Sequence, residues 1–255
     1  MEFKINNYVT RNSYNNDTIF KIIDIIDNNY ILKGVDIRLF ADSPIEDLNL
    51  CDYSIEEDKI DDYMYLKMER NNYFYLPGKV LHIDGDKDYL NRCLKFYEKA
   101  NVFAVGEHVN EKDVGNITFK LLKKYKPDIL IITGHDSINK KSDISDINNY
   151  KNSKNFVKAV NLAREYEKSH DKLVIIAGAC QSDYESLIKA GANFASSPKR
   201  VNIHALDPAI IAVNIALTER NKEIDLISLL EKTKYGSDGI GGVKSNGLMY
   251  VGYPR

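Results

Sequence analysis

The pattern of hydrophobic and polar residues changes character twice along the chain. Up to about Ser43, short runs rich in β-branched and aromatic residues alternate with polar, Asn-rich clusters. This pattern is typical of strands joined by turns. In the run VDIRLF at 35–40, hydrophobic and polar residues alternate with a period of two, as in a half-buried strand. We predict a small all-β unit, an SH3-like barrel, over residues 1–45.

The segment 46–76 has a different composition. Acidic residues crowd its first part and tyrosines follow them. We predict a mainly helical acidic linker here, with the helix from about Ser54 to Arg70. An acidic surface of this kind suits a basic docking partner, but a solvated helix is the simpler interpretation.

Residues 77–255 alternate between short apolar runs and segments of helical pattern. The apolar runs have the length of buried strands and lie at 79–83, 101–105, 128–133, 172–177 and 194–196. Strands that alternate with helices form parallel sheets through right-handed crossovers. We therefore predict an α/β domain with a doubly wound, mainly parallel sheet, a three-layer sandwich of the flavodoxin or caspase kind.

Two of these predicted strands end in side chains capable of covalent chemistry. The run 173–177 leads through small residues to Cys180, and the run 128–133 leads through Gly134 to His135. Sites of open α/β sheets lie at the carboxyl ends of the strands. A cysteine attacks as its thiolate, which a nearby histidine or helix N-terminus favours. We predict that Cys180 is a nucleophile and His135 its general base.

Residues around this pair are candidates for supporting roles. Glycines allow a substrate backbone to approach closely, and backbone amides can stabilise an oxyanion. The oxyanion and supporting candidates are Gly134, Asp136, Gly178 and Gln181. Polar residues that follow the last predicted parallel strand would line a substrate pocket. The pocket candidates are Ser196, Ser197, Asn202, His204 and Asp207, together with Glu107 near the second strand.

Other interpretations of the same residues stay open. A cysteine at a strand end is often a small buried hydrophobe, and a lone histidine there is often structural. The Asp-rich turn 84–86 would suit a non-enzymatic, receiver-like module that binds a ligand or a partner. A metal site built from His135, Cys180, His204 and Asp207 has no short ligand pair behind it. We therefore expect no metal and no cofactor.

Composition narrows the class of protein. The chain has 255 residues, a net charge of −2 and three widely spaced cysteines. So small a charge gives no bulk attraction to nucleic acid or to an anionic membrane, and isolated cysteines indicate a reducing compartment. The N-terminus lacks the apolar core of a signal peptide, and no apolar run reaches the roughly 18 residues of a membrane span. We expect a cytoplasmic protein, of an oligomeric state that the sequence leaves open.

Long blocks of the sequence resemble the YabG family of sporulation-specific proteases. The blocks are VDIRLFAD (35–42), LPGKVLHIDGD (76–86), KPDILIITGHD (126–136), AGACQS (177–182) and AGANFASSPKRVNIHALDP (190–208). The order of histidine before cysteine on successive strands also resembles the caspase-like cysteine peptidases.

The resemblance implies a specific function. It implies a cysteine endopeptidase that forms an acyl-enzyme and cleaves spore coat or cortex-associated proteins during sporulation. It implies a location in the cytoplasm of the mother cell or in association with the spore coat, with protein substrates and neither nucleic acid nor membrane as partners. Cys180 would be the nucleophile and His135 the base. A preference for a basic residue before the cut would need an acidic pocket residue, for which Asp207 and Glu107 are the candidates.

Overall fold

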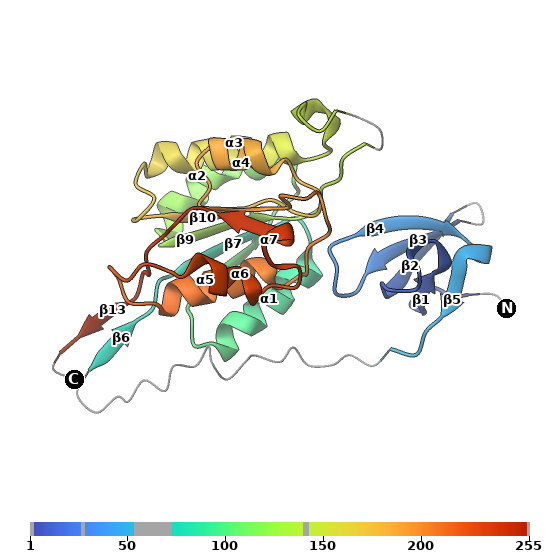
Figure 1. The fold of residues 1–255 in the computed structure, drawn as a ribbon, viewed down its shortest axis with the longest axis horizontal. Helices are drawn as coiled ribbons and strands as arrows, with labels where there is room; N and C mark the ends of the chain where they lie inside the picture. Colours follow the sequence, from blue (N-terminus) through green and yellow to red (C-terminus); the bar gives the residue numbers. More distant parts are fainter. Residues whose placement is uncertain (1–2, 27–28, 54–72, 140–142, 254–255) are drawn as a thin grey trace. The chain divides into compact units, whose positions relative to one another are not determined.

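The computed structural model describes residues 3–26, 29–53, 73–139 and 143–253 (Figure 1). The chain divides into two compact units, Met1–Asp58 and Lys59–Arg255. The helix predicted over 54–70 lies outside the described residues.

The N-terminal unit is a five-stranded antiparallel sheet. Its strands lie in the order β4-β3-β2-β1-β5, and they are β1 (Tyr8–Arg11), β2 (Phe20–Ile26), β3 (Asn29–Gly34), β4 (Phe40–Pro44) and β5 (Leu48–Leu50). Alternate residues point to one face, where Phe20, Ile22, Tyr30 and Leu32 form a core with Val9. The antiparallel sheet confirms the all-β prediction, while the likeness to an SH3-like barrel stays a prediction. Strand β5 lies beyond residue 45, so the sheet extends into the segment that the sequence assigned to the linker.

The second unit is built on a six-stranded sheet of order β12-β11-β10-β9-β7-β8. Five strands are parallel and the edge strand β12 is antiparallel; they are β7 (Val80–Asp84), β8 (Ala104–His108), β9 (Ile129–Thr133), β10 (Val174–Ala177), β11 (Phe194–Ser196) and β12 (Ile240–Gly242). This confirms the mainly parallel α/β prediction. Numbered in chain order, the parallel strands follow the doubly wound order 2-1-3-4-5, whose switch point lies between β7 and β9. Strands β6 (Phe74–Leu76) and β13 (Tyr250–Gly252) form a separate ribbon.

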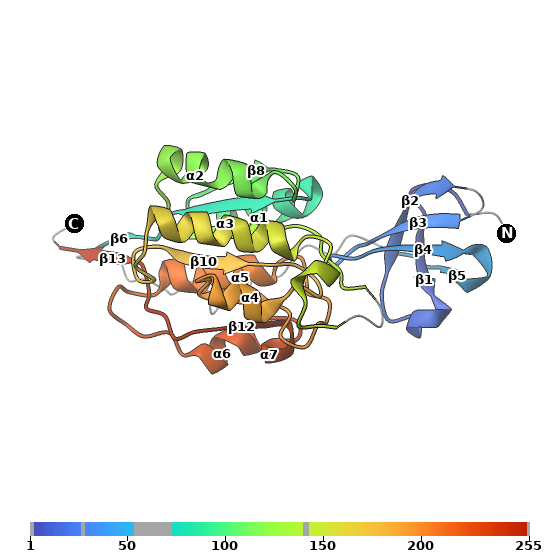
Figure 2. The same ribbon diagram turned by 90° about the horizontal axis from the view of Figure 1, so that it is seen from above.

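Helices cover both faces of the six-stranded sheet (Figure 1). One face carries α1 (Lys87–Lys99), α5 (Asp207–Leu217), α6 (Leu226–Glu231) and the short α7 (Gly236–Gly239). The other carries α2 (Val114–Tyr125), α3 (Ser153–Tyr166) and α4 (Tyr184–Lys189). Figure 2 shows α3 between α2 and α4 on that face.

The central strands are apolar at nearly every position because both of their faces are buried. Their side chains alternate between two cores. Ile129, Ile131 and Ile176 pack in the core under α1 and α5, whereas Leu130 and Ile132 pack in the core under α2 and α3. The position of a residue along its strand therefore determines the helical layer that it faces.

Arg164 ties α3 to the sheet. Its guanidinium donates hydrogen bonds to the carbonyl oxygens of Gly191 (2.8 Å) and Leu173 (2.9 Å) and to the side-chain oxygen of Asn193 (2.6 Å). That oxygen also accepts from the backbone N–H of Ile175 in β10 (3.0 Å). Burial lowers the pKa of Arg164 to about 10 because the charged form loses hydration. The hydrogen bonds of the guanidinium compensate for that loss.

The substitution Arg164→Met keeps most of the aliphatic volume and removes these donors. Acceptors left without partners carry the full penalty of desolvation, so we expect the free energy of unfolding to fall by about 2–4 kcal/mol in urea titrations. Lys168→Met, at an exposed position just beyond the same helix, is the control and should change stability by less than about 0.5 kcal/mol. Equal losses in the two variants would contradict the role given to Arg164.

Candidate active site

Strands β9 and β10 pair in a register that brings the predicted nucleophile and base to the same level. Ile132 lies opposite Ala177, and the N–H of Gly178 continues the pairing by donating to the carbonyl of Ile132 (3.0 Å). His135 and Cys180 each follow three residues after this pair. Counted along the chain, His135 and Cys180 therefore stand equally far past this pair, just beyond the carboxyl ends of adjacent strands.

Strands β7 and β9 extend this alignment by one more residue. Asp84 lies opposite Thr133, and the N–H of Gly85 donates to the carbonyl of Thr133 (3.0 Å). Two residues further along each chain stand Asp86 and His135, whose side chains meet with Nε2 of the imidazole 2.9 Å from Oδ2 of the carboxylate. Asp86, His135 and Cys180 thus each follow the carboxyl end of one of three neighbouring strands, and we call these three residues the site row.

His135 and Asp86 lie on the side of the sheet covered by α1 and α5. His135 comes four residues after Ile131, which faces that side. Two contacts agree with this placement: the ring of Tyr89 in α1 lies 5.8 Å from the imidazole between centroids, and Asp86 is the N-cap of α1. The row also lies beside the topological switch point, where ligands bind in open α/β sheets.

His135 is held at its backbone as well as at its ring. Its N–H donates to Oε1 of Glu111 (2.9 Å), and its carbonyl accepts from the side-chain amide of Asn152 (2.8 Å). Glu111 was not singled out in the sequence. A Cβ at Gly134 would lie 2.6 Å from Oε1 of Glu111, and one at Gly85 would lie 2.2 Å away. The glycines at these two strand ends make room for that carboxylate, and they were the sequence signal for it.

Cys180 is fully buried, and its sulfur lies against the main chain of Ile203. The N–H of Ile203 donates to Sγ (3.3 Å), and the carbonyl oxygen of Ile203 lies 3.9 Å from the same sulfur. Gln181, in a left-handed conformation (φ 56°), donates its N–H to the carbonyl of Val201 (3.1 Å). Residues 197–203, here called the rim segment, are therefore joined by hydrogen bonds to the turn that carries the thiol.

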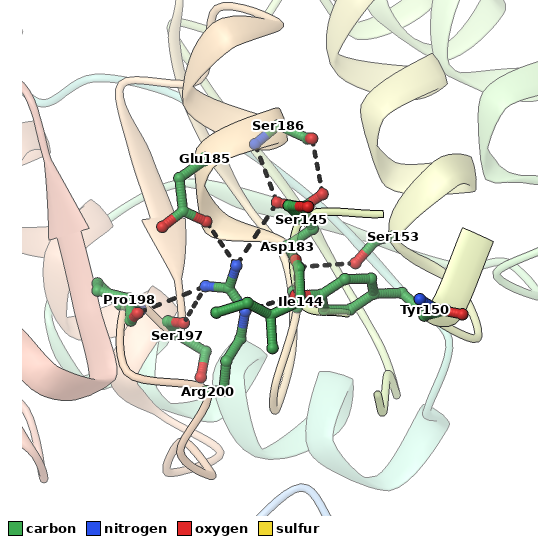
Figure 3. Close-up of polar contacts among 12 residues, drawn as sticks. Ile144, Ser145, Tyr150, Ser153, Asp183, Glu185, Ser186, Ser197, Pro198 and Arg200 are labelled. Carbon is green, nitrogen blue, oxygen red and sulfur yellow. Dashed lines mark hydrogen bonds and ion pairs between the residues drawn. The ribbon is translucent and has the colours of Figure 1, made fainter. Parts of the chain in front are cut away.

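Arg200 fastens the rim segment to its surroundings (Figure 3). Its guanidinium donates to the hydroxyl of Tyr150 (2.6 Å), to a carboxylate oxygen of Glu185 (2.5 Å) and to the carbonyl of Ser197 (3.2 Å). It also lies 3.7 Å from Oδ1 of Asp183, the N-cap of α4. The Arg200 side chain thus connects the rim segment with the start of α4 and with Tyr150.

Asp136 faces the other side of the sheet from the site row. Its Oδ1 accepts from the N–H groups of Ser137 (2.9 Å) and Asn152 (2.7 Å), and its Oδ2 accepts from the hydroxyls of Ser153 (2.5 Å) and Ser182 (2.9 Å). Asp136 therefore joins the loop after β9, the start of α3 and the turn after β10 by hydrogen bonds.

Gly178 takes a left-handed backbone (φ 104°), and a Cβ there would lie 2.9 Å from Cδ1 of Leu187. Its N–H donates to the carbonyl of Ile132 within the sheet, and the N–H of Gln181 donates to the carbonyl of Val201 in the rim segment. Both residues shape the turn that presents Cys180.

Comparison with known proteins identifies one family. A family model described as YabG peptidase U57 matches residues 4–70 and 55–254. The "Sporulation-specific protease YabG" of Bacillus subtilis (strain 168) is 41% identical over 286 aligned positions, which cover all of this chain and 99% of that protein. The chain belongs to the YabG family. This confirms the resemblance found in the sequence and identifies the chain as a sporulation protease.

Three of the pocket candidates in this YabG-family chain lie beside the Cys180 turn. Ser196 and Ser197 are buried, and a Cβ at Gly178 would lie 3.2 Å from Cβ of Ser196. The side-chain oxygen of Asn202 lies 3.5 Å from Nε2 of Gln181. These contacts place Ser196 and Asn202 at the turn that follows β10, and Ser197 is the next residue after Ser196.

The other pocket candidates are placed differently. The carboxylate of Asp207 is buried and accepts from the N–H groups of His204 (2.9 Å) and Lys234 (3.0 Å), which anchors two loops at the start of α5. Glu107 lies opposite Ile83, whose side chain faces α2 and α3, and accepts from the hydroxyl of Tyr125 (2.5 Å). The sheet therefore separates Glu107 from the site row.

In the part of the YabG-family chain that the structure describes, no three His, Cys, Asp or Glu side chains are grouped so that they could hold a metal ion. Over the same described residues, every helix falls short of the length and apolar character needed to cross a bilayer.

Asp136 makes the free energy of unfolding of this YabG-family protein depend on pH. Burial raises the pKa of Asp136 above the usual value near 4. The folded protein therefore binds this proton more tightly than the unfolded chain, and this group makes the free energy of unfolding fall as the pH rises from about 4 through the raised native pKa. In Asp136→Asn the amide donates to the two serine oxygens and the contribution disappears.

We expect the stability of Asp136→Asn, relative to the wild type, to increase with pH over that interval in urea titrations. Asp136→Ala, which leaves the serines and backbone donors without their acceptor, should lose about 2–4 kcal/mol at pH 4 and below, and this loss should become smaller as the pH rises through the raised native pKa. Parallel stability curves for the wild type and Asp136→Asn would show that the carboxyl group does not titrate in this way.

Proposed function

We propose that the chain is a cysteine endopeptidase that cleaves spore coat or cortex-associated proteins, with Cys180 as the nucleophile and His135 as the general base. The observation that supports it most is the pairing of β9 with β10, which aligns the two residues on adjacent parallel strands. The family supports proteolysis in sporulation, and the class of substrate rests on the family resemblance found in the sequence.

The proposed reaction is acyl transfer in two steps. Nδ1 of His135, the ring nitrogen turned away from Asp86, takes the proton of the thiol, and the sulfur attacks the carbonyl carbon of the scissile peptide. Collapse of the tetrahedral intermediate breaks the C–N bond, and His135 gives its proton to the leaving amine. His135 then takes a proton from water, which attacks the thioester, and returns that proton to the departing thiolate.

The backbone of Ile203 supports the nucleophilic role of Cys180. Its N–H points at the sulfur from 3.3 Å, and a hydrogen bond to the charged form of an acid stabilises that form. We assign the backbone amides of Gly134 and Cys180 as the hydrogen-bond donors to the oxyanion of the tetrahedral intermediate. The amide of Gly178 already donates to the carbonyl of Ile132.

The receiver-like alternative finds less support. Asp84 is fully buried, lies 3.4 Å from Nε2 of His82 and accepts from the N–H of Asp86 (2.9 Å). A carboxylate that receives a phosphoryl group or binds a partner must be reachable from solvent. Burial of Asp84 between these groups therefore favours the peptidase.

The substitutions Cys180→Ala and His135→Ala test the dyad directly. Each should lower the rate of cleavage of extracted spore coat proteins by at least about a thousandfold, because the remaining groups cannot form the acyl-enzyme. Cleavage would be followed by mass spectrometry of the products, and folding by circular dichroism. Cys51→Ala, at a partly exposed thiol in the N-terminal unit, is the control and should retain full activity. Undiminished cleavage by Cys180→Ala would refute the proposed nucleophile.

The buried sulfur carries a second consequence for the peptidase. A substrate carbonyl reaches Sγ only when the rim segment moves away from Cys180, so the Arg200 bonds should limit access to the thiol. We expect Arg200→Ala to speed alkylation of Cys180 by iodoacetamide by about tenfold, the effect of losing about 1.4 kcal/mol of closed-state stability. Lys199→Ala, exposed on the same segment, should leave the rate unchanged.

Buried Cys93 in α1 serves as the internal reference for this labelling experiment. Its rate should stay constant in Arg200→Ala, because only the rim segment is loosened. An unchanged Cys180 rate in Arg200→Ala would show that Arg200 does not control access to the sulfur. Parallel acceleration of both thiols would indicate global unfolding instead.

A further inference from the structure

The carboxylate of Asp86 makes different contacts with its two oxygens. Oδ1 accepts from the N–H groups of Asp88 (2.9 Å) and Tyr89 (3.2 Å), as the N-cap of α1. Oδ2 lies 2.9 Å from Nε2 of His135. The first oxygen therefore fixes the plane of the carboxylate against a thirteen-residue helix, while the second faces the imidazole.

Asp86 is fixed at its backbone too. Its N–H donates to Oδ1 of Asp84 (2.9 Å). Asp84 is fully buried beside His82, whose Nδ1 lies 2.8 Å from the hydroxyl of Tyr97 in α1. The backbone of Asp86 is therefore held by a connected set of buried polar groups: Asp84, His82 and Tyr97. Such a network preorganises the carboxylate of Asp86 for its hydrogen bond.

The contact between Asp86 and His135 is also shielded from water. The side chain of Asp86 is 6% exposed and that of His135 is 14% exposed. A hydrogen bond between these groups is screened much less than one on the surface. The arrangement has the properties required of a group that orients a catalytic imidazole, as a buried carboxylate does in serine proteases.

We infer that Asp86 is the positioning residue of the site. Its carboxylate accepts a hydrogen bond from the protonated Nε2 of His135, and this leaves Nδ1 as the basic nitrogen that faces the thiol. This inference rests on the proposed function of Cys180 and His135. When His135 takes the proton of Cys180, both ring nitrogens carry hydrogen, and the carboxylate compensates the positive charge. The site row then acts as a carboxylate, imidazole and thiol in that order.

A purely structural role as a helix cap is the rival explanation, and substitutions separate the two. In Asp86→Asn the side-chain oxygen keeps the cap, but its NH₂ group faces Nε2 and favours the opposite tautomer of His135. Asp86→Ser also keeps a good cap and removes the partner of the imidazole. Both variants should fold with a Tm close to that of the wild type.

We expect kcat for cleavage of a coat-derived peptide to fall about a thousandfold in Asp86→Asn and Asp86→Ser, with KM changed less than about threefold, because the peptide does not contact Asp86. Asp225→Asn is the matched control: Asp225 caps α6 through Ser228 in the same way, and its substitution should leave kcat unchanged. Near wild-type kcat in Asp86→Ser would show that Asp86 is only a cap.

The tautomer of His135 gives a readout that is independent of activity. Nitrogen-15 NMR spectra of histidine-labelled protein distinguish the two ring nitrogens, and His135→Ala identifies the resonances among the five histidines. We expect hydrogen on Nε2 in the wild type and on Nδ1 in Asp86→Asn. The same tautomer in both proteins would overturn the inference.

The two proposals fail in different ways. Cleavage retained by Cys180→Ala would overturn the proposed function and the catalytic role of Asp86 with it. Cleavage lost in Cys180→Ala but retained in Asp86→Asn would overturn the role of Asp86 alone. The expected result is loss of kcat in Cys180→Ala, Asp86→Asn and Asp86→Ser, with a change of tautomer in Asp86→Asn.

Discussion

The structure of the site depends on the register of three parallel strands. Hydrogen bonds between β7, β9 and β10 fix how far each chain advances before it leaves the sheet. A slip of one residue in either pairing would turn the following side chains to the opposite helical layer. The apolar residues of these strands face two separate cores, so such a slip would expose or misplace both sets at once. Core packing therefore fixes the strand ends after which Asp86, His135 and Cys180 follow.

The two sides of the sheet edge have separate tasks. On the α1 side stand the imidazole and the carboxylate that contacts it. On the α3 side, Asp136 and Glu111 bind backbone groups of the same loops. Buried carboxylates are tolerated only when hydrogen bonds compensate their desolvation. Here those bonds fix the backbone that carries His135, so one set of acidic groups orients the loop while another faces its side chain.

Much of the fold followed from the sequence because the signals are local. Apolar runs with strand lengths, separated by helical patterns, were enough to predict the parallel sheet and the strand ends that carry Cys180 and His135. The interval of 45 residues between them (180 − 135) became informative only with the pairing of β9 and β10, whose partners are also 45 apart (177 − 132). Local pattern carries no such pairing information.

The parts of the site that the sequence did not predict all depend on contacts between residues far apart in the sequence. Asp86 was visible as part of an acidic turn, yet its partner lies 49 residues away. Glu111 fills the space over two glycines from different strands, and Ile203 reaches the sulfur from 23 residues downstream. Glu107 was placed near the site because it follows a parallel strand, but the alternation of side chains turns it to the α2 side.

The groups around Cys180 differ in how firmly they are held. His135 is fixed through its backbone N–H, its carbonyl and its ring, by residues from three different segments. The rim segment lies over the sulfur through backbone bonds of Val201 and Ile203, and Arg200 supplies its main side-chain attachment. In the proposed mechanism the base must keep its geometry throughout the reaction, whereas the rim segment must move to admit a peptide. Rigidity around His135 and a releasable attachment of the rim segment are the combination that the proposed thiol peptidase requires.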